Sequence, residues 1–168
     1  FWELSDKFKK NNLNFTIKFY NLISKNFINK KLIKLKKKFK NTIHYENNFN
    51  KGLTQNLLDQ GNIILFDQPG TAFIECLNCK IPTMVYWKKI FNEPSKRSQK
   101  IFNNLKKVDI IHDNALSLIK AYKNFKKNPY QWINCKKRNL VIKEFCDTYA
   151  LTDHNWSKIW KNFLIKKL

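Results

Sequence analysis

The sequence predicts an α/β fold in which a parallel sheet carries helices on both faces and a helical segment follows the sheet. Strand-like apolar runs alternate with segments whose apolar residues recur at helical spacing. Successive predicted strands are separated by about ten or more residues, the length that a crossover between parallel strands needs. After Pro129 only helical patterns remain. With 168 residues, 43% of them hydrophobic, the chain suits one domain with a closed core.

The strand predictions depend on alternating or continuous apolar residues. Phe15, Ile17 and Phe19 alternate with polar residues, as in a strand with one buried face. The run "NIILFD", which ends at Asp67, is typical of a strand buried on both faces. The five predicted strands span residues 13–21, 42–46, 62–67, 82–87 and 108–112.

The helix predictions fill the segments between and after these strands. The first residue is Phe1 rather than Met, within an apolar-periodic segment, so we expect the natural protein to extend upstream. The lysine run 30–40 is interpreted as a solvated helix face rather than a polyanion-binding patch. The predicted helices span residues 2–11, 52–60, 71–78, 95–107, 114–127, 130–150 and 153–167. Residues 1–128 form the predicted sheet domain, and the helices of 129–168 pack on it in the same structural unit.

The charge suits an anionic ligand but does not predict a specific nucleic-acid partner. The net charge is +21, yet lysine is spread along the chain together with abundant Asn, Ile and Phe, as an A/T-rich coding sequence produces. Arginine, which nucleic-acid binders favour, occurs only at positions 97 and 138. No apolar run of about 18 residues, signal peptide or cysteine framework is present. We therefore expect a cytoplasmic location, with peripheral association at the inner face of the membrane as an alternative.

The stretch "DQPGT" follows the predicted strand 62–67 at the end where ligands bind in open parallel sheets. Glycine there permits a bend or a close approach by a ligand, and the next helix presents free amide groups to a phosphate. We expect the Asp67 carboxylate to turn towards amides of its own loop or towards sugar hydroxyls, away from the phosphate. Ordinary turn and cap chemistry is the alternative. The candidate ligand-binding residues of this stretch are Asp67, Gly70, Thr71, Ala72 and Glu75.

The cysteines and histidines carry weaker predictions. Cys76 and Cys79 form a CxxC, but a structural zinc site needs a second pair at suitable spacing. We interpret these thiols as buried bystanders and expect no metal. His112, which follows a predicted strand, either lines the same cleft or is a structural histidine.

"FDQPGTAFIECLNCKIPTMVYW" at 66–87 resembles the donor-site region of a group of bacterial cell-surface polysaccharide transferases with the GT-B glycosyltransferase fold. "FNNLKKVDIIHDNALSLIKAY" at 102–122 and "YQWINCKKRNLVIKEFCDTYA" at 130–150 are similar to later segments of that group. "FTIKFYN" at 15–21 resembles its basic, aromatic strand, with Lys18 where Arg is common, so the bidentate phosphate fork is lost. Together these ordered motifs cover roughly residues 14–163.

The resemblance implies that the chain is the carboxyl-terminal, Rossmann-like donor-binding half of a GT-B-type glycosyltransferase. It implies a nucleotide-sugar donor, a glycan or lipid-linked acceptor, no obligatory metal or other cofactor, and a role in surface polysaccharide biosynthesis. Lys18 and His112 join the candidate donor site by this resemblance. The catalytic residues stay unassigned, because the acceptor domain commonly supplies the base, and the isolated chain is expected to be inactive. The open alternatives are a non-enzymatic basic module that binds polyanions and a polyol-phosphate transferase of related fold.

Overall fold

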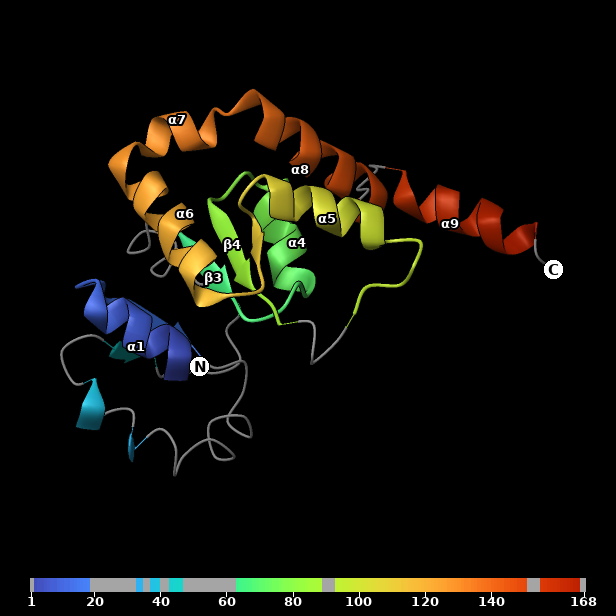
Figure 1. Cartoon of the computed structure of the whole chain (residues 1–168). Coiled ribbons are helices and arrows are strands. Elements are labelled where there is room, and N and C mark those ends of the chain that lie inside the picture. The colour runs from blue at the N-terminus through green and yellow to red at the C-terminus, as the bar shows by residue number, and fades with distance from the viewer. Residues whose placement is uncertain are drawn as a thin grey trace.

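The computed structural model describes residues 2–18, 33–34, 37–39, 43–46, 63–88, 93–150 and 155–166. Helices and parallel strands alternate along this part of the chain, and a helical segment ends it (Figure 1). The predicted α/β class is therefore confirmed, with a Rossmann-like parallel arrangement. The predicted helix 52–60 and most of the lysine run 30–40 lie outside the described residues.

The strands pair in two separate parallel sets. β1 (Phe15–Lys18) pairs with β2 (Ile43–Glu46). The second set is a three-stranded sheet in the order β3-β4-β5, formed by β3 (Ile64–Phe66), β4 (Thr83–Tyr86) and β5 (Ile111–His112). The register places Phe66 beside Val85 and Tyr86 beside His112. Within the described residues the five predicted strands thus form two sheets rather than one.

The strands of the three-stranded sheet differ in burial. Every residue of the central strand β4 is buried, whereas Ile64, Leu65 and Phe66 of β3 are half-buried. The expectation of complete burial at 62–67 is therefore wrong for the described residues of β3. β5 is also shorter than predicted. Asp109 adopts a left-handed conformation (φ 61°), so the chain turns before it enters the sheet at Ile111.

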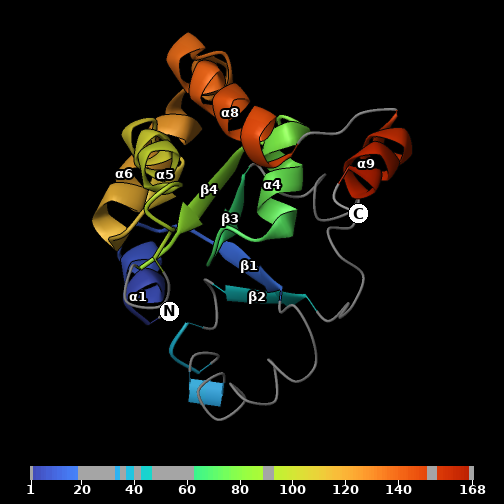
Figure 2. The ribbon, with the colours of Figure 1, turned by 90° about the vertical axis from the view of Figure 1, so that its right-hand side faces the viewer.

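Two crossover helices connect the three strands. α4 (Thr71–Asn78) joins β3 to β4, and α5 (Gln99–Lys107) joins β4 to β5. Both pack against α8 (Lys136–Tyr149), where the Phe145 ring lies 5.8 Å from that of Phe73 and 5.7 Å from that of Phe102. These three helices cover one face of the sheet (Figures 1 and 2).

The other face is covered by α6 (Ala115–Lys127) and α1 (Trp2–Lys10), as Figure 1 shows. The Phe8 and Tyr122 rings, 6.2 Å apart, join these two helices. The chain then continues through α7 (Pro129–Ile133), α8 and α9 (Trp156–Ile165). The described residues after Pro129 form no strand, in agreement with the prediction.

Candidate functional site

The turn that joins β3 to α4 lies at the carboxyl edge of the three-stranded sheet. β3 ends at Phe66, and α4 begins at Thr71 as predicted. Asp67, Gly70 and Thr71 are exposed. Gly70 is the N-cap residue of α4, so no side chain caps the helix, and its first turn contains no acidic residue. An uncapped helix amino terminus with a partial positive charge therefore faces solvent here, which is a geometry suited to an anion.

Gly70 is required neither by the backbone nor by packing. Its φ of −90° and ψ of −171° are extended values that any residue adopts. A Cβ atom built on Gly70 would have no heavy atom within 4 Å. The missing side chain therefore leaves open space directly over the amino terminus of α4.

The other candidate residues of this stretch surround the same helix end. Thr71 and Glu75 are both exposed, and a spacing of four residues places them on one face of α4. Ala72, whose amide belongs to the first turn, is half-buried. Asp67 is exposed, so its carboxylate oxygens are accessible to a ligand.

Lys18 and His112 lie on other strands than β3, which leads into this turn. Lys18 ends β1, in the separate β1–β2 pair, where its backbone lies in register with Glu46. His112 ends β5, and β4 separates that strand from β3. The His112 ring is buried, with Nδ1 3.2 Å from Ser117 Oγ and Nε2 3.2 Å from the Asp109 carbonyl oxygen. Burial lowers the pKa of this imidazole below its ordinary value.

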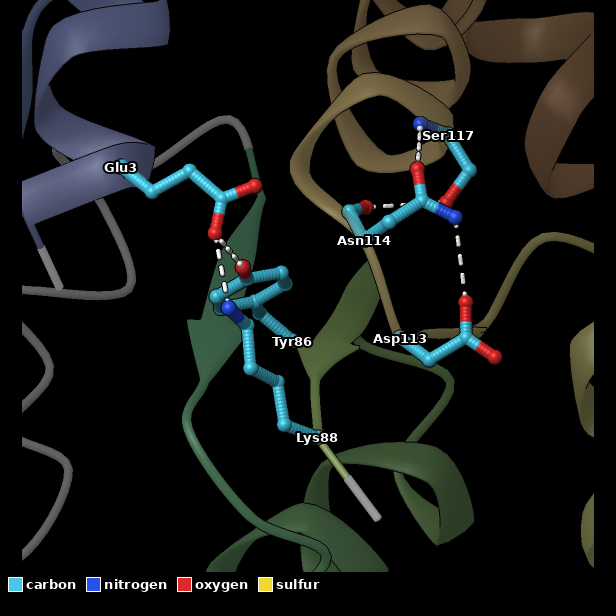
Figure 3. A network of polar contacts seen from close by, with 6 residues as sticks. All are labelled: Glu3, Tyr86, Lys88, Asp113, Asn114 and Ser117. Atoms are coloured by element: carbon cyan, nitrogen blue, oxygen red, sulfur yellow. Dashed lines mark hydrogen bonds and ion pairs between the residues drawn. The ribbon is translucent and has the colours of Figure 1, made fainter. Parts of the chain in front are cut away.

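A second group of polar side chains lies where β4 ends, and sequence reasoning did not identify it. Glu3 of α1 accepts hydrogen bonds at Oε2 from Tyr86 Oη at 3.1 Å and from Lys88 Nζ at 2.7 Å (Figure 3). The bond from Lys88 lowers the pKa of Glu3, and the same bond raises the pKa of Lys88. Burial raises the pKa of Tyr86. The cluster therefore places a charged ammonium beside a carboxylate at the carboxyl edge of the central strand.

The loop after β5 is built by ordinary capping chemistry. Asn114 caps α6 by accepting a hydrogen bond at Oδ1 from the Ser117 amide, and it donates through Nδ2 to Asp113 (Figure 3). Burial works against the Asp113 carboxylate, but bonds from Lys106 and Asn114 outweigh it, so the pKa of Asp113 lies below its ordinary value. These contacts hold the loop firmly beside the end of β4.

The cysteines of the CxxC differ in exposure. Cys76 is buried, and burial raises the pKa of its thiol to about 11, while Cys79 is exposed. A thiol with such a pKa is protonated near neutral pH and a poor nucleophile or metal ligand. Over the part of the chain that the structure describes, no cluster of His, Cys, Asp and Glu is arranged to hold a metal ion. The bystander interpretation thus fits the buried Cys76 but not the exposed Cys79.

The sequence contains a partial signal for the cluster of Glu3, Tyr86 and Lys88. Lys88 follows a predicted buried strand and therefore lies at the same sheet edge as "DQPGT". That position is a signal for adding Lys88 to the candidate ligand-binding residues. Glu3 offered no such signal, because it is 85 residues from Lys88 in the chain.

A family model described as LIC12162 family transferase matches residues 3–164, which is nearly the whole chain. Neither a curated protein nor a solved structure gives a significant match. Within the described residues, no helix combines the length and the apolar character that crossing a bilayer requires.

Proposed function

The chain belongs to the LIC12162 family of transferases, and from this membership we propose that it is the donor-binding part of a glycosyltransferase. It would take a nucleotide-activated sugar as the donor and serve surface polysaccharide biosynthesis. The β3–α4 turn is the proposed donor site. The supporting observation is the exposed amino terminus of α4, with open space over Gly70.

In this proposal the backbone does most of the phosphate binding. The amides of Thr71 and Ala72 donate to the diphosphate, whose negative charge the dipole of α4 stabilises. Stabilisation of the diphosphate as a leaving group is the electrostatic contribution that transfer of the sugar requires. Asp67 and Glu75, both exposed, would accept hydrogen bonds from sugar or ribose hydroxyls.

Lys88 is the proposed cationic partner of the phosphate. It follows β4, the strand next to β3, so its ammonium belongs to the same edge of the sheet. Its ion pair with Glu3 is exposed, and an exposed pair exchanges partners at little cost. The amides of this turn and Lys88 would then stabilise the negative charge of the phosphate. A separate domain would bind the acceptor and supply the catalytic base.

The test compares Gly70→Val with Thr71→Ser by calorimetric titration of the chain with a panel of nucleoside diphosphates. We expect the parent to bind one of them in the presence of EDTA. Valine fills the space over the helix terminus and should weaken that affinity at least roughly tenfold, whereas serine keeps the amides and should change it less than about twofold. A folded Gly70→Val variant with unchanged affinity, or a parent that binds no nucleotide, would exclude this turn as the donor site.

A polyanion-binding role is the second candidate, supported by a groove between α1 and α6. Three lysines line it, Lys7, Lys120 and Lys123, with Asn11 and Asn124 beside them. Such a surface would bind heparin or nucleic acid with strong salt dependence. Loss of heparin binding in Lys120→Gln, with nucleotide binding absent in the parent, would favour this function over transfer.

A further inference from the structure

Helix α9 exposes large apolar side chains along the part whose side chains the structure describes. Every residue from Ser157 to Lys166 is exposed. Trp160, Leu164 and Ile159 are 58%, 54% and 50% exposed, although side chains of these types are usually buried. In Figure 1 α9, drawn in red, lies beyond the end of α8 and away from the sheet.

The apolar residues of α9 form one stripe. Ile159, Trp160, Phe163 and Leu164 follow the spacing that places residues on one helix face. The Trp160 and Phe163 rings pack edge to face, 5.9 Å apart. The stripe is therefore a continuous apolar surface rather than isolated exposed residues.

A helix as short and as exposed as α9 is only marginally stable by itself. The helix has ten residues, and helices shorter than about 12 residues are marginal in water unless an apolar face packs against something. None of its described side chains is buried. A surface outside the described part of the chain must therefore cover the stripe.

The charge of α9 indicates what that surface is. Lys158, Lys161 and Lys166 are the charged residues of 155–166, which contains no Asp or Glu. A stripe of Trp, Phe, Leu and Ile opposite lysines is typical of helices that lie in the interfacial layer of a membrane. A second copy of the chain suits this helix poorly, because each copy carries a net charge of +21 and the copies repel.

We propose that α9 binds the surface of a bilayer that contains anionic lipids. The apolar stripe enters the boundary between headgroups and acyl chains, and Lys158 and Lys161 contact the lipid phosphates. The helix lies in the plane of the membrane and does not cross it. This proposal is independent of the donor site, since α9 contributes no residue to the β3–α4 turn.

The experiment measures co-sedimentation of the chain with vesicles of phosphatidylcholine alone or mixed equally with phosphatidylglycerol. We expect binding to the mixed vesicles that weakens with salt, and a blue shift of tryptophan emission. The double variant Trp160→Glu with Leu164→Glu should bind at least roughly tenfold more weakly. Leu140→Glu, at a 68% exposed apolar position on α8, controls for a new surface carboxylate and should bind like the parent.

Two double variants of equal net charge test whether the position of the lysines matters. Lys158→Gln with Lys161→Gln should weaken binding to the mixed vesicles roughly tenfold. Lys136→Gln with Lys137→Gln, on the exposed start of α8, removes the same charge and should weaken it much less. Equal losses in both pairs would overturn the proposal, as would a parent that binds no vesicle. Self-association that disappears in the Trp160 and Leu164 double variant would assign the stripe to a second copy instead.

Discussion

Glu3 Oε2 lies 2.7 Å from Lys88 Nζ, and this contact joins helix α1 to the end of the central strand β4. The two residues are 85 positions apart in the sequence. The same carboxylate oxygen accepts a bond from Tyr86, so α1 approaches the carboxyl edge of the sheet through a single acidic side chain. Any ligand that recruits Lys88 must compete with Glu3.

The first prediction concerns this competition. Lys88→Gln should weaken binding of the nucleoside diphosphate roughly fivefold or more, because a charge-assisted hydrogen bond is lost. Glu3→Gln should leave the affinity unchanged or raise it, since the ammonium is released. Calorimetric titration measures both effects. Lys143→Gln, which breaks the Lys143–Asp147 pair on α8, is the matched control. An equal loss in this control would show that only the general charge matters.

The second prediction concerns Arg138, which is buried although it is charged. Its guanidinium donates to the carbonyl oxygens of Val108, at 2.8 Å, and Trp132, at 2.5 Å, and lies over the Trp132 ring. Arg138→Met leaves both oxygens without this donor and should lower the free energy of unfolding by about 2–4 kcal/mol. Urea unfolding provides the measurement.

Two comparisons make the Arg138 prediction specific. Arg138→Lys should recover only part of the loss, because lysine lacks the planar fork that reaches two acceptors. Arg97→Met, at an exposed position, should change the free energy of unfolding by less than about 0.5 kcal/mol. If Arg138→Met were as stable as Arg97→Met, the buried guanidinium would contribute nothing to the fold.

The third prediction is a pH dependence set by His112. Burial lowers the pKa of this imidazole from an ordinary value of 6.5, while Asp109 and Asp113 act in the opposite direction. Between the folded-state pKa and pH 6.5, the imidazole is therefore protonated in more unfolded molecules than folded ones. The contribution of the neutral His112 to the free energy of unfolding is thus fully present above pH 6.5. It is lost as the pH falls towards the folded-state pKa.

Urea unfolding between about pH 5 and pH 8 measures this contribution. The parent should lose stability more steeply than His112→Gln as the pH falls, by up to about 1.4 kcal/mol per pH unit. Parallel curves for the two proteins would mean that His112 is protonated equally easily in the folded and unfolded chains.

The fourth prediction concerns the CxxC. At about pH 8, a thiol of pKa about 11 is thiolate in roughly one molecule in a thousand, so Cys76 should resist iodoacetamide until the chain unfolds. The exposed Cys79 should react first. Peptide mass spectrometry with and without urea distinguishes the sites, and Cys79→Ala identifies the fast one. Comparable rates at both positions in the folded chain would contradict the burial of Cys76.

Local sequence patterns were sufficient to predict a helix or strand where the residues that define its ends or its burial are close together in the chain. The Pro-Gly turn ends before Thr71, and the left-handed Lys80 (φ 57°) follows Cys79, so α4 has the predicted bounds. The unbroken apolar run of 84–87 likewise indicated the buried strand β4. The same patterns placed the turn 67–70 at a strand end, although what it binds stays a prediction.

The sequence by itself determined the alternation of helices and strands, the parallel class and the position of the exposed turn, because these follow from periodicity and turn residues along the chain. Only the tertiary structure decided that Glu3 meets Lys88, that Arg138 is buried and that α9 keeps its apolar stripe exposed. The physical reason is that these properties depend on which distant segments pack together. Identical local patterns are compatible with a buried or an exposed side chain, and packing selects between them.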